Sequence, residues 1–270
     1  MSLRIAIGSH PTSDLQRSHA EALAAGVRAC GDAAIIVDHG PPPPGVHAYA
    51  GWGWRRCQKH RRAGLKLLCM ERGYLGDRMC WTSLGWGGLN GNADFCAPQD
   101  PGPERYEAHY TPLAPWREAG DYVLIMGQVP GDMSLQGRDL RPWYVQMARE
   151  AAEAYGLPVF LRPHPSAVRR NLWKGCGVPE MGGDLDEALA GAHVVVTWNS
   201  NSATDAVVAG VPALTMDRGA VAWPVTGHSI GDRIRPDRSA WAHRLAWCQW
   251  SLAEIADGTA WRQLRRHLEN

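Results

Sequence analysis

The sequence lacks the features that mark disulfide-rich, metal-binding or membrane-spanning proteins. Its seven cysteines include no Cys-x-x-Cys pair, and an odd number of thiols cannot all form disulfides. We therefore expect reduced thiols. Because no cysteine pair has ligand spacing and the histidines do not cluster beside the cysteines, we also expect no bound metal. No apolar run is long enough to cross a bilayer, and no signal peptide precedes the first strand-like segment. These absences predict a cytoplasmic protein without a transmembrane segment.

An excess of charge of either sign is also missing. The formal net charge is +1, so any attraction to a nucleic acid or an anionic membrane must come from a local cluster. Hydrophobic residues make up 45% of the 270 residues and charged residues 20%, as in ordinary soluble globular proteins. A chain of this length forms one large domain or two small ones, and its 30 glycines and 19 prolines indicate many turns.

Short apolar segments alternate with helical patterns in two series. The first series predicts strands at residues 4–8, 33–38, 46–51 and 65–71, with helices at 14–30 and from Trp54 onward. The second predicts strands at 122–127, 159–162, 193–197 and 212–216, with helices at 142–155, 185–190 and 202–209. Five prolines within residues 97–120 indicate a linker between the two series.

This pattern predicts an α/β fold with two Rossmann-like domains facing across a cleft. We expect an acceptor-side domain at 1–110, a nucleotide-sugar-binding domain at 118–238 and terminal helices at 239–270. Tryptophans at helical spacing within 239–258 predict a C-terminal helix that packs back on the core. Continuous apolar strands joined by helices indicate parallel sheets, and ligands bind at the carboxyl ends of such strands.

Two polar segments follow strands of the second series. Arg162 and His164 end a strand between two prolines, where the histidine can donate a hydrogen bond to a phosphate and the arginine can add a forked contact. The alternative is a histidine that only caps the strand end. The second segment, Asn199, Ser200, Asn201 and Ser202, opens a helix, so it favours either an anion site or ordinary capping.

Carboxylates for catalysis are sparse at the predicted strand ends. Asp132 lies in a Gly/Pro turn after a strand, where it is either a base or sugar ligand or an Asx-turn residue. In the first half, Glu71 ends the fourth strand and is the better candidate. His10, after the first strand, ranks below it, and Asn90 lies in a glycine-rich loop.

Several segments, in order, resemble the capsular-polysaccharide biosynthesis glycosyltransferases, which include the Kdo transferases of capsule export. They are Glu71–Leu75, Gly88–Asn90, Gln128–Ser134, Arg162–Pro165, Asn199–Pro212 and residues 247–261. The resemblance implies a GT-B fold, no bound metal, a nucleotide-sugar as co-substrate, His164 with Gln128 on the donor side, and Asp132 in catalysis. Gly85 departs from it, because the family tends to have a second carboxylate there.

A basic cluster lies in the predicted acceptor half. Arg55, Arg56, Lys59, Arg61 and Arg62 supply five cations beside two tryptophans. Such a cluster favours a polyanion, with the alternative of a solvated helix face that has no partner.

The sequence thus predicts a metal-independent glycosyltransferase. The acceptor is either a hydroxymethylated pyrimidine in DNA, as in virus-type base modification in a host cytoplasm, or an anionic surface glycan. The compact size, Gly85 and the arginine cluster favour hydroxymethylcytosine-type DNA. The other hypotheses are a nucleotide-sugar epimerase and a non-catalytic nucleic-acid-binding module.

Overall fold

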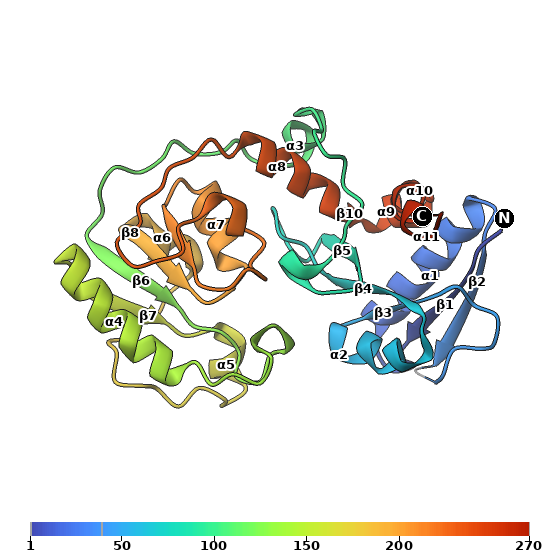
Figure 1. The fold of residues 1–270 in the computed structure, drawn as a ribbon, viewed down its shortest axis with the longest axis horizontal. Helices are drawn as coiled ribbons and strands as arrows, with labels where there is room; N and C mark the ends of the chain where they lie inside the picture. Colours follow the sequence, from blue (N-terminus) through green and yellow to red (C-terminus); the bar gives the residue numbers. More distant parts are fainter. Residues whose placement is uncertain (1, 39, 270) are drawn as a thin grey trace. The chain divides into compact units, whose positions relative to one another are not determined.

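The computed structural model describes residues 2–38 and 40–269, without the side chains of Arg62 and Ala63 (Figure 1). It divides into two compact units. Unit 1 comprises Met1–Tyr110 and Ala242–Asn270, and unit 2 comprises Thr111–Trp241. Within the described part of the chain, the structure contains no helix that is both long and apolar enough to pass through a membrane.

Unit 1 is built on a six-stranded sheet with the strand order β10-β5-β4-β3-β1-β2. Its elements are β1 (Arg4–Ser9), α1 (Asp14–Ala29), β2 (Ala33–Asp38), β3 (Ala48–Trp52), α2 (Trp54–Cys57), the 3-10 helix η1 (Gln58–Ala63), β4 (Lys66–Arg72), β5 (Trp81–Trp86), the 3-10 helix η2 (Asn90–Asn92) and α3 (Glu104–His109). Strands β1 to β4 are parallel. Strand β5 runs antiparallel to β4, and β10 runs antiparallel to β5.

The C-terminal residues complete this sheet. Their elements are α8 (Ser239–Leu245), the 3-10 helix η5 (Ala246–Cys248), β10 (Gln249–Ser251), α9 (Leu252–Ala256), α10 (Thr259–Leu264) and α11 (Arg266–Glu269). Trp250 and Trp261 are fully buried in the same core as Ile5 and Leu23, which confirms that the C-terminal segment packs back on the core. Helix α9 lies so close to α1 that a Cβ atom at Gly26 would lie 2.0 Å from the Ile255 carbonyl oxygen.

Three details of the predicted elements were wrong. The proposed linker contains a helix, α3, and strand β5 was not predicted. The single helix expected over 239–258 is interrupted by β10, because the buried Gln249 side chain bonds to a distant backbone. Its Oε1 accepts from the Tyr74 and Leu75 N–H groups at 2.5 and 3.0 Å, and its Nε2 donates to the Leu75 carbonyl at 3.0 Å. A new helix then starts at the Ser251 capping box.

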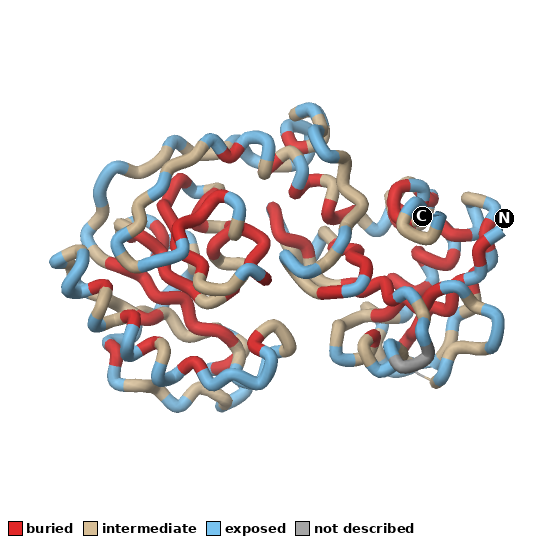
Figure 2. Tube along the Cα trace, in the orientation of Figure 1, coloured by how far each residue is buried: buried red, intermediate tan, exposed pale blue. Residues whose placement is uncertain are grey.

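Unit 2 has a four-stranded parallel sheet with the order β7-β6-β8-β9. Its elements are β6 (Tyr122–Met126), the 3-10 helix η3 (Met133–Leu135), α4 (Arg141–Tyr155), β7 (Val159–Arg162), α5 (Pro165–Arg169), α6 (Leu185–Ala190), β8 (Ala192–Thr197), α7 (Ser202–Val208), β9 (Ala213–Thr215) and the 3-10 helix η4 (Trp223–Val225). One apolar core contains residues of α6 and α7, and another contains residues of α4. Figure 2 shows the central strands of each unit, such as β1 and β3 in unit 1 and β6 and β8 in unit 2, as mostly buried.

Candidate functional site

The carboxyl ends of β6, β7 and β8 meet at one edge of the unit 2 sheet, because these strands are parallel neighbours. The residues after β6 pass directly against those after β7. A Cβ atom on Gly127 would lie 3.0 Å from the Arg162 carbonyl oxygen and 3.3 Å from the His164 nitrogen. This edge therefore brings the predicted segments at Gln128 and His164 side by side, and glycine at 127 permits the close approach.

Gln128 and Asn199 form a buried, doubly hydrogen-bonded pair across this edge. The Gln128 Nε2 atom donates to Asn199 Oδ1 at 2.8 Å, and the Asn199 backbone N–H donates to Gln128 Oε1 at 3.1 Å. The Asn199 Nδ2 atom donates to the Ser134 carbonyl at 3.0 Å and to Asp217 Oδ1 at 3.1 Å. These bonds hold the loops after β6 and β8 together.

Asp132 is exposed and caps the short helix η3. Its Oδ1 accepts from the Ser134 backbone N–H at 2.9 Å and from the Ser134 hydroxyl at 2.7 Å. The structure thus contains the Asx-type turn that the sequence offered as the alternative to a catalytic role. Through Ser134, the loop that carries Asp132 is also tied to Asn199.

His164 caps the N-terminus of α5, a short helix that was not predicted. Its Nδ1 accepts a hydrogen bond from the Ser166 backbone N–H at 3.1 Å. In a neutral ring this bond fixes the proton on Nε2, which makes that atom a donor. Capping therefore uses the Nδ1 nitrogen of the ring.

The other predicted donor-side residues bond mainly within their own loops. Arg162 donates to the Gly183 carbonyl at 3.0 Å and lines a hollow with residues 180–183. The Ser202 hydroxyl and backbone N–H donate to Ser200 Oγ at 2.8 and 3.2 Å. Asn201 occupies the N-cap position of α7 without a side-chain capping bond. The structure does not bring the Arg162 guanidinium to the Gln128–Asn199 pair.

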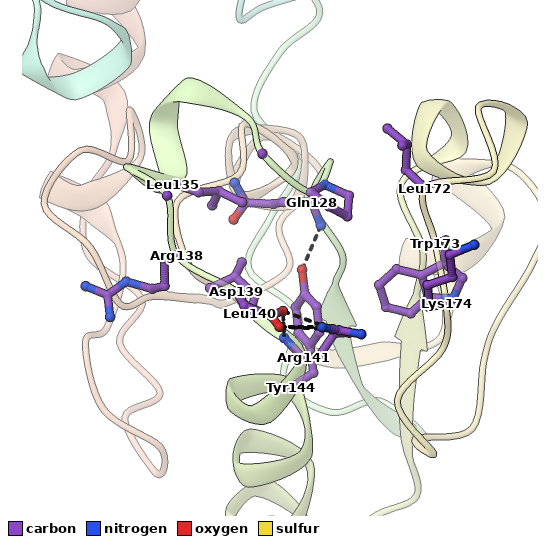
Figure 3. Close-up of a pocket in the computed structure, with 13 residues that line it drawn as sticks. Gln128, Leu135, Arg138, Asp139, Leu140, Arg141, Tyr144, Leu172, Trp173 and Lys174 are labelled. Carbon is purple, nitrogen blue, oxygen red and sulfur yellow. Dashed lines mark hydrogen bonds and ion pairs between the residues drawn. The ribbon is translucent and has the colours of Figure 1, made fainter.

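A pocket of about 320 Å³ opens beside Gln128, within the size range of small-molecule sites (Figure 3). Trp173 and Lys174 lie on the side opposite Gln128 and Tyr144, and the Arg141 side chain points across toward Trp173. The Tyr144 and Trp173 rings have centroids 5.8 Å apart. The pocket therefore combines aromatic surface with cationic groups.

Local contacts hold these side chains in place. The Tyr144 hydroxyl accepts from the Gln128 backbone N–H at 2.9 Å, and burial raises the pKa of Tyr144 to about 12, so it stays protonated at neutral pH. Trp173 donates from Nε1 to Glu180 at 2.6 Å, and Arg141 pairs with Asp139 at 2.7 Å. The pocket also includes the start of α4, a 15-residue helix whose positive end favours anions.

Sequence reasoning identified Gln128 but missed the rest of this pocket. Tyr144 lies on an ordinary amphipathic helix, and Trp173 and Lys174 lie in a loop without periodicity. The local signal for these pocket residues is the pair Trp173 and Lys174, an aromatic residue next to a cation, which follows the Arg162–Pro165 segment. Arg138 also lines the pocket, but its guanidinium lies over the Trp198 ring, 4.5 Å from its centroid.

In unit 1, Glu71 and Asn90 line a small hollow of about 10 Å³ that also includes Gly85. The structure thus brings together the predicted carboxylate and the predicted loop asparagine. It also explains the glycine, because a Cβ atom at Gly85 would lie 2.6 Å from Ala93 Cβ and 2.9 Å from the Phe95 ring. Side chains of the 93–95 segment fill the position where a second carboxylate would stand.

The predicted basic cluster is not a single helical face. It spans the four-residue helix α2 and the 3-10 helix η1. Arg56 donates to Gln16 Oε1 at 2.6 Å, while Arg61 donates to the Gly87 carbonyl at 3.3 Å and lies over the Trp54 ring. Arg55 is exposed, and the Arg62 side chain lies outside the described residues.

His10 lies in the loop after β1 and supports the entry to α1. Its Nδ1 is 3.3 Å from the Thr12 backbone nitrogen and 3.0 Å from the Thr12 hydroxyl. Its carbonyl accepts from the Ser13 N–H at 3.1 Å.

No protein-family model matches the sequence, and no curated protein matches it. Two solved structures share its fold along almost the whole chain, both of KpsC from Thermosulfurimonas dismutans. The β-Kdo 2,4 transferase has a TM-score of 0.61 at 17% identity and covers 98% of both chains. The β-Kdo 2,7 transferase has a TM-score of 0.54 at 12% identity, over 97% of this chain and 100% of that one.

These likenesses confirm the predicted fold class. The chain has a GT-B-type α/β fold with two Rossmann-like sheet regions, and it resembles the Kdo transferases of capsule biosynthesis in structure. At these identities the likeness concerns the fold, while the activity has to be argued from the site.

Proposed function

We propose that the protein is a glycosyltransferase that moves a sugar from a nucleotide-sugar donor to an acceptor hydroxyl. The observation that carries the proposal is the pocket at the carboxyl edge of unit 2, where the half-buried Trp173 ring stands beside Arg141 and Lys174. A nucleotide joins a flat base to anionic phosphate, and this lining offers a partner to each part.

In the proposed reaction, the acceptor oxygen attacks the anomeric carbon as the bond to the donor phosphate breaks. A carboxylate, Asp132 or Glu71, takes the proton of the acceptor hydroxyl. Arg141, Lys174 and the Nε2–H of His164, rather than a metal ion, neutralise the departing phosphate. The Gln128–Asn199 pair holds the loop after β6, which carries Asp132.

We propose an anionic surface glycan as the acceptor class. The two solved structures of similar fold are β-Kdo transferases, which supports a glycan acceptor. The basic cluster would attract either polyanion, and two of its five cations, Arg56 and Arg61, already bond within unit 1. Because Ala93 and Phe95 pack against Gly85, the acceptor half differs at this position from the family that the sequence resembles. A hydroxymethylated pyrimidine in DNA is the second acceptor that the assay below includes.

The test is a mass-spectrometric screen of nucleotide-sugars against glycan acceptors and hydroxymethylated DNA. We expect a sugar-sized mass increase on a glycan with one donor. An increase on DNA alone would replace the glycan proposal. An isomerised nucleotide-sugar formed without acceptor would identify an epimerase, and salt-dependent DNA binding without turnover would identify a nucleic-acid-binding module.

A pair of tryptophan variants tests the pocket itself. Calorimetric titration with nucleotides should show binding by the native protein that falls at least tenfold in Trp173→Ala. Trp223→Ala is the control, because Trp223 is also half-buried in unit 2 but stacks on His228 outside the pocket. Equal affinity in the two variants would remove the pocket from the donor site.

A further inference from the structure

Three potential metal ligands from distant parts of the chain meet at the edge of unit 1. One ligand atom each from Asp94, Cys96 and His267 lies within 4.8 Å of the others. The Asp94 Oδ2 atom is 2.9 Å from His267 Nδ1 and 3.9 Å from the Cys96 sulfur. The cluster takes no part in the proposed transfer reaction.

The surrounding structure holds each ligand in place. Asp94 forms an antiparallel bridge with Trp86, with N–H to carbonyl distances of 2.8 and 3.0 Å. The Trp86 ring, itself 1% exposed, stacks on the His267 ring with centroids 5.0 Å apart and an interplanar angle of 8°. One buried tryptophan thus fixes the strand that carries the carboxylate and the plane of the imidazole.

Cys96 is held in an unusual backbone conformation. Its φ is +52°, in the left-handed region that a cysteine rarely adopts, and its N–H donates to Asp94 Oδ1 at 2.8 Å. This turn directs the sulfur toward the same side as the carboxylate. Mixed sulfur, nitrogen and oxygen ligands are typical of zinc.

We propose that Asp94, Cys96 and His267 bind a zinc-type divalent cation. Zinc bonds of about 2.0 to 2.3 Å place tetrahedral ligand atoms roughly 3.3 to 3.8 Å apart, so the side chains need to move by about 1 Å. The cluster faces an open cavity, which leaves room for water as a fourth ligand. Lys66 and Arg266 line the same cavity and oppose a cation, but both are exposed to solvent, and the thiolate and carboxylate together carry two negative charges.

The metal would link the C-terminal residues to the β5 edge. His267 lies in α11, whereas Asp94 and Cys96 follow η2, so the His–Asp contact joins positions 173 residues apart. A cation that binds the folded protein and not the separated ligands stabilises the fold by mass action.

The test is titration of the full, chelator-treated chain with Co²⁺, followed by competition with Zn²⁺. We expect one equivalent of Co²⁺ with a thiolate-to-metal charge-transfer band and tetrahedral d–d bands, both displaced by Zn²⁺. The bands should be lost in Cys96→Ser and His267→Ala. The bands should persist in Cys80→Ser, the matched control. Cys80 is an exposed thiol that also lies near a carboxylate, 3.4 Å from Asp77, but it does not belong to the Asp94, Cys96 and His267 cluster.

A thermal measurement covers the case in which His267→Ala unfolds. Added Zn²⁺ should raise the melting temperature of the native protein and of Cys80→Ser, and leave that of Cys96→Ser unchanged. Absence of stoichiometric Co²⁺ binding by the native protein, or a charge-transfer band that persists in Cys96→Ser, would overturn the proposal.

Discussion

Removing the Asn199 side chain tests whether the hydrogen-bonded pair at the carboxyl edge of unit 2 holds its loops. Asn199→Ala keeps the backbone bond to Gln128 Oε1 but deletes three side-chain bonds. These are the bonds from Gln128 Nε2 at 2.8 Å, to the Ser134 carbonyl at 3.0 Å and to the Asp217 carboxylate at 3.1 Å. Asn199 is only 2% exposed, so water cannot easily replace them.

The expected cost follows from the type of each bond. A neutral bond contributes about 1 kcal/mol net and one to a charged group about 1.5 to 3 kcal/mol, which gives roughly 3 to 5 kcal/mol for the set. Because each 1.4 kcal/mol is about a factor of ten, local opening of residues 128–136 should become roughly 100- to 4,000-fold more frequent.

Hydrogen–deuterium exchange of the 128–136 segment measures this opening, and urea unfolding measures the cost to unit 2. Gln146→Ala is the control, since Gln146 is an exposed amide on α4 with one surface partner, and its effect should stay within about 0.5 kcal/mol. In Asn199→Asp, a carboxylate oxygen would face Asp217. That variant should therefore be least stable to urea at neutral pH and gain stability as acid protonates the pair. Exchange in Asn199→Ala that matches Gln146→Ala would refute the reasoning.

Three further changes have defined outcomes. Gly85→Asp should destabilise unit 1 by about 1 to 3 kcal/mol in urea melts, because the new Cβ overlaps Phe95; native-like stability would contradict this. Burial opposes the charge of Glu254, but hydrogen bonds from Arg105 outweigh it and hold the pKa of this carboxyl below its ordinary value of 4.5. Its contribution to stability is therefore present above pH 4.5 and lost as the pH falls through the folded-state pKa, and an Arg105→Met variant should show a flatter acid unfolding curve. His164→Asn keeps a capping oxygen but loses the Nε2 donor, so it should melt like the native protein while turnover falls about 100-fold or more; unchanged turnover would remove His164 from the donor site.

The parallel strands of both sheets were predictable because their signal is local. A strand buried on both faces is a continuous apolar run, and the run at 122–127 covers β6, whose residues after Tyr122 are all buried. Strand β10 has no such run. The tryptophans around it fit helical spacing equally well, and what decides the conformation is Gln249, whose amide bonds to backbone 174 and 175 residues away. A partner at that distance leaves no trace in a local pattern.

The candidate site shows the same division. Polar residues that follow parallel strands lie at one edge of the sheet, and Gln128 and Asn199 meet there although 71 residues separate them. Whether such residues face a ligand or each other depends on side-chain directions that spacing does not encode. Arg162 illustrates this, because its position at the end of β7 was predictable but its bond to Gly183 was not.

Residues 93–96 link Gly85, where the resembled family tends to have a second carboxylate, to the proposed metal ligands. Ala93 and Phe95 pack on Gly85 and exclude a side chain there. Asp94 and Cys96, in the same segment, meet His267 and line a different cavity. A cation at the cluster would therefore tighten the same segment that closes the hollow beside Glu71 and Asn90. Zn²⁺ should therefore slow hydrogen exchange across residues 85–96 in the native protein and not in Cys96→Ser, since the metal acts on that segment only through Asp94 and Cys96.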